Sequence, residues 1–125
     1  MLKNSINWFE IPVVDFERAK TFYSTIYDFE MPEAQMGKVK MGFFLYEQQP
    51  DRVGGAICQG EDYVPSREGA LIYLNGGNDL NTVLNRIEDA GGEVLLAKTH
   101  IQEDIGYFAL FIDTEGNRVA LHSRE

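Results

Sequence analysis

The sequence predicts an α+β protein built from two β-α-β-β-β units that follow one another along the chain. Its 125 residues are 44% hydrophobic and 12% aromatic, which is typical of one globular domain with its own core. Two acidic helix-capping residues, Asp15 and Asp79, lie about half the chain length apart, and the elements after each have the same order. We therefore expect a single domain over residues 1–125 with an internal repeat, residues 1–60 and 68–125. The alternative is an ordinary α+β sandwich in which two helices are similarly spaced by chance.

The first unit begins with a β-prone segment over residues 6–14, and Pro12 favours an edge strand. Asp15 is an N-cap residue for a helix that we expect to end near Tyr27. The apolar residues of this segment recur at helical spacing: Phe16, Ala19, Phe22, Tyr23 and Ile26. Three strands are expected after the helix, over residues 29–32, 39–46 and 53–59, with a turn at residues 49–51.

The second unit repeats this order. A strand is expected over residues 70–75, followed by a helix capped by Asn78 or Asp79. The apolar face of that helix comprises Leu80, Val83, Leu84 and Ile87. Residues 90–92, Ala-Gly-Gly, end the helix as a glycine C-cap does. Strands are then expected over residues 93–97, 107–112 and 118–122.

The charge and the cysteine content exclude several classes of protein. A net charge of −9, with 11 Lys and Arg against 20 Asp and Glu, disfavours binding to nucleic acid and to anionic membranes. No signal peptide or membrane-spanning stretch is evident. The single cysteine, Cys58, cannot form an intramolecular disulfide. We expect a cytoplasmic protein.

Three segments resemble the vicinal oxygen chelate superfamily, which includes glyoxalase I, bleomycin-resistance proteins and extradiol dioxygenases. They are IPVVDFERAKTFYSTIYDFEM at residues 11–31, AGGEVL at 90–95 and GYFALFIDTEGNRVALHS at 106–123. The resemblance covers nearly the whole chain. It implies the glyoxalase/bleomycin-resistance/dioxygenase fold, in which two β-α-β-β-β modules form a cupped mixed sheet. It also implies a homodimer.

The same resemblance locates the positions at which metal-dependent members carry three or four His, Glu or Gln ligands in the cup. In this chain those positions are Trp8, Cys58, Leu71 and Ala120. Divalent metals need several converging oxygen or nitrogen donors, and indole, isobutyl and methyl groups offer none. We therefore expect no metal and no cofactor, and none of the family's metal-dependent activities.

Strand alternation predicts which side chains line the cup. Phe9, Ile11 and Val13 are expected in the core, as are Val119 and Leu121 on the last strand and Ile72 and Leu74 on the fifth. The predicted ligand-binding residues are Trp8, Glu10, Cys58, Leu71, Tyr73, Arg118, Ala120 and His122, with Asn75 on the same face as Leu71 and Tyr73. This aromatic and apolar lining with a few polar groups is typical of a small-molecule pocket.

Glu10 is the candidate catalytic residue, because a carboxylate beside an indole in a partly dry cup could act as a general base or bind a cation. Equally, Glu10 could pair with Arg118 or His122 and only hold the sheets in register. Cys58 is expected to be a small buried hydrophobe. His100 is expected in a solvated loop.

Three functions follow from these observations. The first is a bleomycin-resistance-like protein that binds a small organic molecule in the cup without a metal, as drug-sequestering relatives do. The second is a glyoxalase-like lyase or isomerase that uses Glu10 as a base, with or without a divalent metal. The third is a regulatory or partner-binding module whose own side chains fill the cup.

Overall fold

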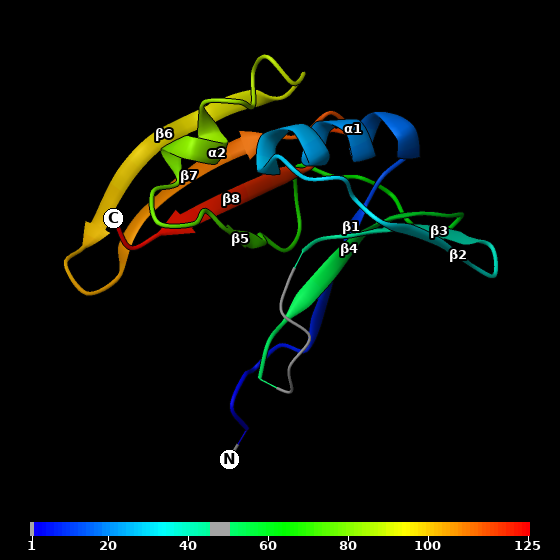
Figure 1. The fold of residues 1–125 in the computed structure, drawn as a ribbon, viewed down its shortest axis with the longest axis horizontal. Coiled ribbons are helices and arrows are strands. Elements are labelled where there is room, and N and C mark those ends of the chain that lie inside the picture. Colours follow the sequence, from blue (N-terminus) through cyan, green and yellow to red (C-terminus); the bar gives the residue numbers. More distant parts are fainter. Residues whose placement is uncertain (1, 46–50) are drawn as a thin grey trace.

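Two four-stranded mixed sheets make up the fold in the computed structural model, which describes residues 2–45 and 51–125. The first sheet comprises β1 (Trp8–Pro12), β2 (Glu33–Met36), β3 (Val39–Phe43) and β4 (Gly54–Gln59), in the order β1-β4-β3-β2. The second comprises β5 (Tyr73–Asn75), β6 (Glu93–Gln102), β7 (Gly106–Ile112) and β8 (Arg118–Ser123), in the order β5-β8-β7-β6. The β1–β4 and β5–β8 pairs are parallel and the other pairs are antiparallel. Figure 1 shows the second sheet on the left and the first on the right, with α1 beside their junction.

Helix α1 (Phe16–Tyr27) has the predicted bounds and the predicted cap. The Asp15 carboxylate accepts a hydrogen bond from the Arg18 backbone N–H. The helix ends at Asp28, whose φ of 52° is left-handed and lets its N–H reach the carbonyls of Ser24 and Thr25. No helix in the described residues is long and apolar enough to cross a membrane.

The second helix is much shorter than predicted, since α2 covers only Asn81–Leu84. Several bonds around it join residues three apart, such as Arg86 N–H to the Val83 carbonyl, so most of the segment consists of successive turns. Asn and Thr in this stretch favour such local structure over a regular helix. The prediction that residues 90–92 end this helix is wrong, because the C-cap of α2 is Asn85; the turns that follow the helix run on to Gly91, which has φ 106°.

One large apolar core joins the two halves of the chain. The apolar residues of α1 and of the α2 segment meet there with the inner faces of both sheets. The predicted strand residues Ile11, Val13, Leu74, Val119 and Leu121 are all buried in it. Phe9 and Ile72 pack against it while half-buried, so the predicted alternation is confirmed.

Several strand bounds differ from the prediction. The strand expected over residues 29–32 starts instead at Glu33, and Met31 before it is buried in the core. The fifth strand is limited to Tyr73–Asn75. The strand expected over 39–46 ends at Phe43. Residue 46, and residues 49 and 50 of the turn expected at 49–51, lie outside the described residues.

The prediction that His100 lies in a loop is wrong, because β6 continues to Gln102 and pairs His100 with Tyr107. Three register shifts interrupt the pairing of β6 with β7. Each shift breaks the alternation of side chains by which a strand is recognised in a sequence.

The β7–β8 turn ties the second sheet to the start of α1. The buried Glu115 carboxylate accepts the backbone N–H groups of Val14 (2.9 Å) and Asp15 (2.7 Å), and the Arg18 guanidinium at 2.7 Å. In the same turn, the Asn117 amide donates to the Pro12 carbonyl at 2.7 Å. These bonds fix the carboxyl end of β1, and therefore the position of Glu10, relative to the second sheet.

The Asp113 carboxylate organises this turn from within. It accepts the backbone N–H groups of Glu115 and Asn117 and the Asn117 amide. It also accepts the Tyr23 hydroxyl of α1 at 2.8 Å. Burial and the negative charge of Asp113 raise the pKa of Tyr23, so the hydroxyl keeps its proton and remains a donor.

Candidate functional site

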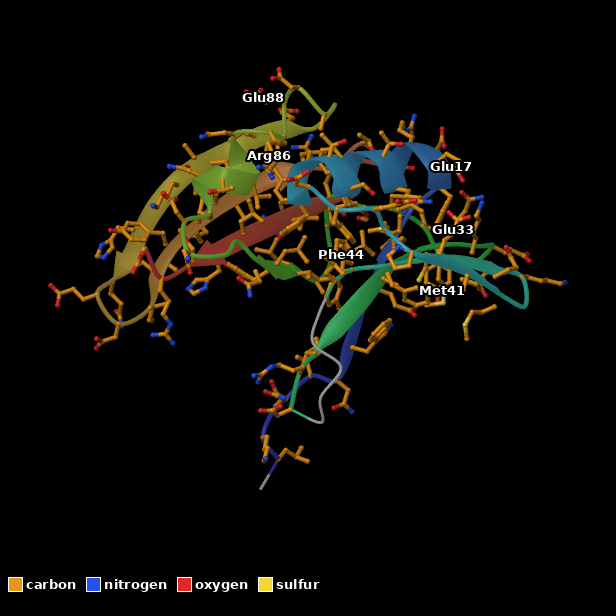
Figure 2. The ribbon with its side chains drawn as sticks, in the orientation of Figure 1. Glu17, Glu33, Met41, Phe44, Arg86 and Glu88 are labelled. Carbon is orange, nitrogen blue, oxygen red and sulfur yellow. The ribbon has the colours of Figure 1, made fainter. Side chains whose placement is uncertain are left out.

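The candidate site is built on the face of the first sheet that points away from α1. Trp8 and Glu10 of β1 lie on this face with Cys58 of β4 and Met41 of β3, because alternate residues of a strand share a face. Figure 2 shows Met41 on the side of the sheet opposite to α1. The buried residues of this apolar cluster are Met41, Ala56 and Cys58, with Trp8, Val39, Phe43 and Tyr63 packed against them.

The Glu10 carboxylate is held by two aromatic donors. The Tyr63 hydroxyl donates to Oε1 at 2.6 Å, and the Trp8 indole N–H donates to Oε2 at 3.4 Å. The bond to Glu10 raises the pKa of Tyr63 to about 12, so Tyr63 is a proton donor at neutral pH. A carboxylate offers about four acceptor positions, and Glu10 also bonds with the Cys58 thiol, so about one position is left for another group.

Tyr63 is not among the site residues predicted from the sequence, because it lies in the loop after β4. Its backbone N–H bonds to the Gly60 carbonyl at 3.1 Å, and this turn brings the ring back to the sheet. The only sequence feature that distinguished it is an aromatic residue directly after the acidic pair at residues 61 and 62.

Cys58 is fully buried beside Glu10. Burial, together with the negative charge of Glu10 and a hydrogen bond with it, raises the pKa of the Cys58 thiol to about 12. The thiol is therefore protonated and unreactive at neutral pH, which confirms the prediction that Cys58 packs as a small hydrophobe.

A cavity of about 210 Å³ lies beside this cluster and is lined by Glu10 and Arg118, together with Val64, Ser66 and Glu68 of the loop that follows β4. Within residues 2–45 and 51–125, no ion pair joins Glu10 to Arg118 or to His122. The proposed structural pairing of Glu10 with either residue is therefore wrong, and Tyr63 and Trp8 hold the carboxylate instead.

Four of the other predicted site residues, Leu71, Tyr73, Ala120 and His122, do not line the cavity at Glu10. Leu71 and Tyr73 line a cavity of about 610 Å³ between the two sheets. Tyr73 and His122 line an open hollow on the second sheet, and the His122 ring contacts the Ile105 carbonyl. Ala120 is fully buried on β8. The structure thus brings Trp8, Glu10 and Cys58 together, places Arg118 in the same cavity as Glu10, and puts the other four residues elsewhere.

The residues at the four family ligand positions do not fit a divalent metal. Trp8, Leu71 and Ala120 offer an indole, an isobutyl and a methyl group, and Cys58 is a protonated thiol at neutral pH. The part of the chain that the structure describes also contains no group of three or more His, Cys, Asp and Glu residues that could hold a metal ion.

Comparisons with known proteins agree with this fold. The sequence profile of the Glyoxalase/Bleomycin resistance protein/Dioxygenase superfamily matches residues 5–121. A "glyoxylase-like domain-containing protein" of Didymella fabae is 30% identical over 129 residues, which cover 99% of this chain and 97% of that protein.

Two solved structures share the architecture. Glyoxalase I from Zea mays superposes with a TM-score of 0.66 and 16% identity, and the match covers 94% of this chain but only 45% of the maize chain. An antibiotic-binding protein from a Streptomyces species superposes with a TM-score of 0.61 and 18% identity, over 98% of this chain and 97% of the other. By its profile match and by its Didymella relative, the chain belongs to the Glyoxalase/Bleomycin resistance protein/Dioxygenase superfamily.

Proposed function

We propose that the protein binds a small organic molecule at Glu10 without a metal. The observation that carries this proposal is the Glu10 carboxylate, which lines a cavity while two aromatic donors fix both of its oxygens. The antibiotic-binding relative of the same architecture supports a binding role. The side chains at the four family ligand positions offer no set of metal donors, which supports binding without a metal.

The surroundings of Glu10 define the ligand. Tyr63 and Trp8 hold the carboxylate in one orientation, so little side-chain entropy is lost when a ligand binds. The acceptor capacity that remains on the Glu10 carboxylate favours a ligand with N–H or O–H donors. Arg118, which also lines the cavity, favours an acceptor or a negatively charged group on another part of the ligand.

A thermal-shift screen tests this proposal with compounds of up to about twelve heavy atoms that carry an amino, amide or hydroxyl donor. We expect at least one compound to raise the melting temperature saturably and to change the fluorescence of Trp8, the only tryptophan in the chain. Glu10→Gln should abolish that shift. Glu17→Gln, on the exposed face of α1, should leave it intact.

The proposal is wrong if no compound of the panel gives a saturable shift, or if Glu10→Gln retains the shift in full. In the first case the third function predicted from the sequence, a module that binds a macromolecular partner, becomes the better explanation. In the second case the ligand binds away from Glu10.

Proton transfer is the second candidate function, because Glu10 and Arg118 line one cavity. In such a reaction a C–H bond next to a carbonyl group breaks, and its proton passes to a Glu10 oxygen. The electron pair stays on the substrate as an enolate, which the Arg118 guanidinium stabilises. Exchange of that C–H hydrogen in D2O, followed by NMR with a bound carbonyl compound, tests this function. Glu10→Gln should stop the exchange.

The homodimer and the cytoplasmic location stay predictions. Large hydrophobic side chains on and beside β6 remain exposed in the isolated chain, among them Leu96, Ile101 and Ile105. Their exposure supports pairing with a second copy. Light scattering of the purified protein would measure the mass of the assembly.

A further inference from the structure

We infer that the protein has a second ligand site, the cavity of about 610 Å³ between the two sheets, and that this site takes an uncharged, mainly apolar aromatic molecule. The cavity lies between β1, the start of β4 and the segment that leads into β5. Figure 2 shows Phe44, one of its lining residues, where the two sheets meet below α1.

The first observation is a wall of aromatic rings. Phe9, Tyr27, Phe29 and Phe44 line the cavity, and all four are only half-buried, so part of each ring remains open to a ligand. The rings of Phe9 and Phe44 lie 5.5 Å apart at 43°, and those of Tyr27 and Phe44 lie 6.4 Å apart at 84°. Inclined rings of this kind offer both faces and edges to an aromatic ligand.

The second observation is the lack of charged side chains among the described residues that line the cavity. The described residues that line the cavity include no Asp, Glu, Lys, Arg or His, although a quarter of the sequence is charged. The Tyr27 hydroxyl already donates to the Asn75 carbonyl at 2.8 Å, and the Asn75 side-chain oxygen accepts the Gly77 N–H at 2.9 Å. A charged ligand would lose its hydration here and gain no oppositely charged partner. The cavity therefore favours uncharged ligands.

The third observation is the volume of the cavity and the exposure of the hydrophobic residues at its rim. A volume of 610 Å³ lies within the range of about 300–1,000 Å³ that small-molecule sites occupy. Three large hydrophobic residues at the rim are left to water, with Ile6 50%, Leu45 71% and Tyr73 53% exposed. A bound apolar molecule would cover this surface, which is the driving force for binding.

This site is distinct from the one at Glu10, although the two cavities adjoin and share Ala70 and Ile72. Phe9 and Glu10 are neighbours on β1, so their side chains point to opposite faces of the first sheet. The sequence placed Leu71 and Tyr73 in the same cup as Glu10, whereas in the structure they belong to the larger cavity. Glu10 lines only the smaller cavity and Leu45 only the larger one, so variants of these two residues test the two sites separately.

A titration with N-phenyl-1-naphthylamine, a neutral probe whose fluorescence rises in apolar surroundings, tests the inference. We expect saturable binding with one probe per chain. Leu71→Glu places a charge in the cavity wall and should weaken binding at least about tenfold. Leu45→Glu changes a mostly exposed residue of the rim, so it should fold normally, and it should weaken binding at least about threefold. The matched control, Leu95→Glu on β6, should bind as the wild type does.

Three results would overturn the inference: probe fluorescence that does not saturate, equal affinity in Leu45→Glu and Leu95→Glu, or loss of binding in Glu10→Gln. Light scattering on the same samples covers a further outcome. If the wild type is a dimer that excludes the probe, and Leu45→Glu is a monomer that binds it, the cavity is an interface between copies of this chain and the small-molecule assignment is wrong.

Discussion

Replacing Glu115 tests whether one buried carboxylate joins the two halves of the fold. Its side chain is fully inaccessible to water and accepts hydrogen bonds from two backbone N–H groups, the Arg18 guanidinium and the Thr114 hydroxyl. The backbone donors belong to Val14 and Asp15, about a hundred residues earlier in the chain. Glu115→Ala removes the acceptor and leaves these donors without it.

The loss of stability expected for Glu115→Ala depends on how exposed each hydrogen-bond donor to Glu115 is. Each partly buried N–H group that loses its acceptor costs about 1–2 kcal/mol. Arg18 is half-exposed, so its guanidinium regains water and the loss of its ion pair adds at most about 1 kcal/mol. The Thr114 hydroxyl can rotate, so it adds little. We expect Glu115→Ala to lower the free energy of unfolding by about 3 kcal/mol, a fall in melting temperature of roughly 10 °C.

Glu115→Gln distinguishes the contribution of the hydrogen bonds to stability from that of the negative charge. The amide oxygen can still accept the two backbone N–H groups, whereas its NH2 group faces the Arg18 donor. We therefore expect a loss of about 1–2 kcal/mol, between the wild type and Glu115→Ala. Urea unfolding followed by circular dichroism measures all three proteins. Glu88→Ala and Glu88→Gln, at an exposed residue, are the matched controls and should change the free energy by less than about 0.5 kcal/mol.

The pH dependence gives a second measurement on the same variants. Burial alone would raise the pKa of Glu115, but the bonds from Arg18 and from the Asp15 and Val14 backbone outweigh it, so the pKa lies below its ordinary value of 4.5. This carboxylate therefore contributes stability that is fully present above about pH 4.5 and is lost as the pH falls through its lowered pKa. The difference between wild type and Glu115→Gln should shrink at acidic pH. A Glu115→Ala loss below 1 kcal/mol, or a difference that grows on acidification, would refute the reasoning.

Three further predictions concern single contacts. Tyr23→Phe should lower the free energy of unfolding by about 1–2 kcal/mol, because Asp113 loses a buried hydroxyl donor; an unchanged urea midpoint would contradict this. Gly55→Ala should lower it by about 1–3 kcal/mol, because the added Cβ would collide with the Phe9 ring; normal stability would mean that the ring moves freely. Cys58 should react with iodoacetamide at pH 8 at least about tenfold more slowly in the native protein than in guanidinium, because burial raises its pKa to about 12; equal rates would argue against that burial.

Much of the fold could be predicted because local rules govern the elements concerned. Helix α1 (Phe16–Tyr27) has a capping carboxylate and an unbroken apolar face, and both are read from neighbouring residues. The alternation of core and outer residues on β1 and β8 likewise depends only on strand geometry. The two sheets have equivalent strand orders, as the predicted repeat requires, but the repeat itself stays a prediction.

The errors occur where distant parts of the chain decide the structure. The length of β6 depends on its pairing with β7 across three register shifts, which no local pattern reveals. Glu115 looks like a solvated turn residue in the sequence, and only its partners near residue 15 account for its burial. Tyr63 was missed for the same reason, because its partner Glu10 lies 53 residues away.

Strand β1 explains why the predicted cup becomes two cavities in the structure. Phe9 lines the larger cavity, whereas Glu10 and the residues that follow it line the smaller one, so β1 contributes different residues to each cavity. The Asn117 amide holds its carboxyl end at Pro12, and the Val13 N–H donates to the Cys58 carbonyl at 2.9 Å. A strand fixed in this way cannot rotate to present both residues to one ligand. Glu10 lines only the smaller cavity, so Glu10→Gln should leave binding of the neutral probe unchanged.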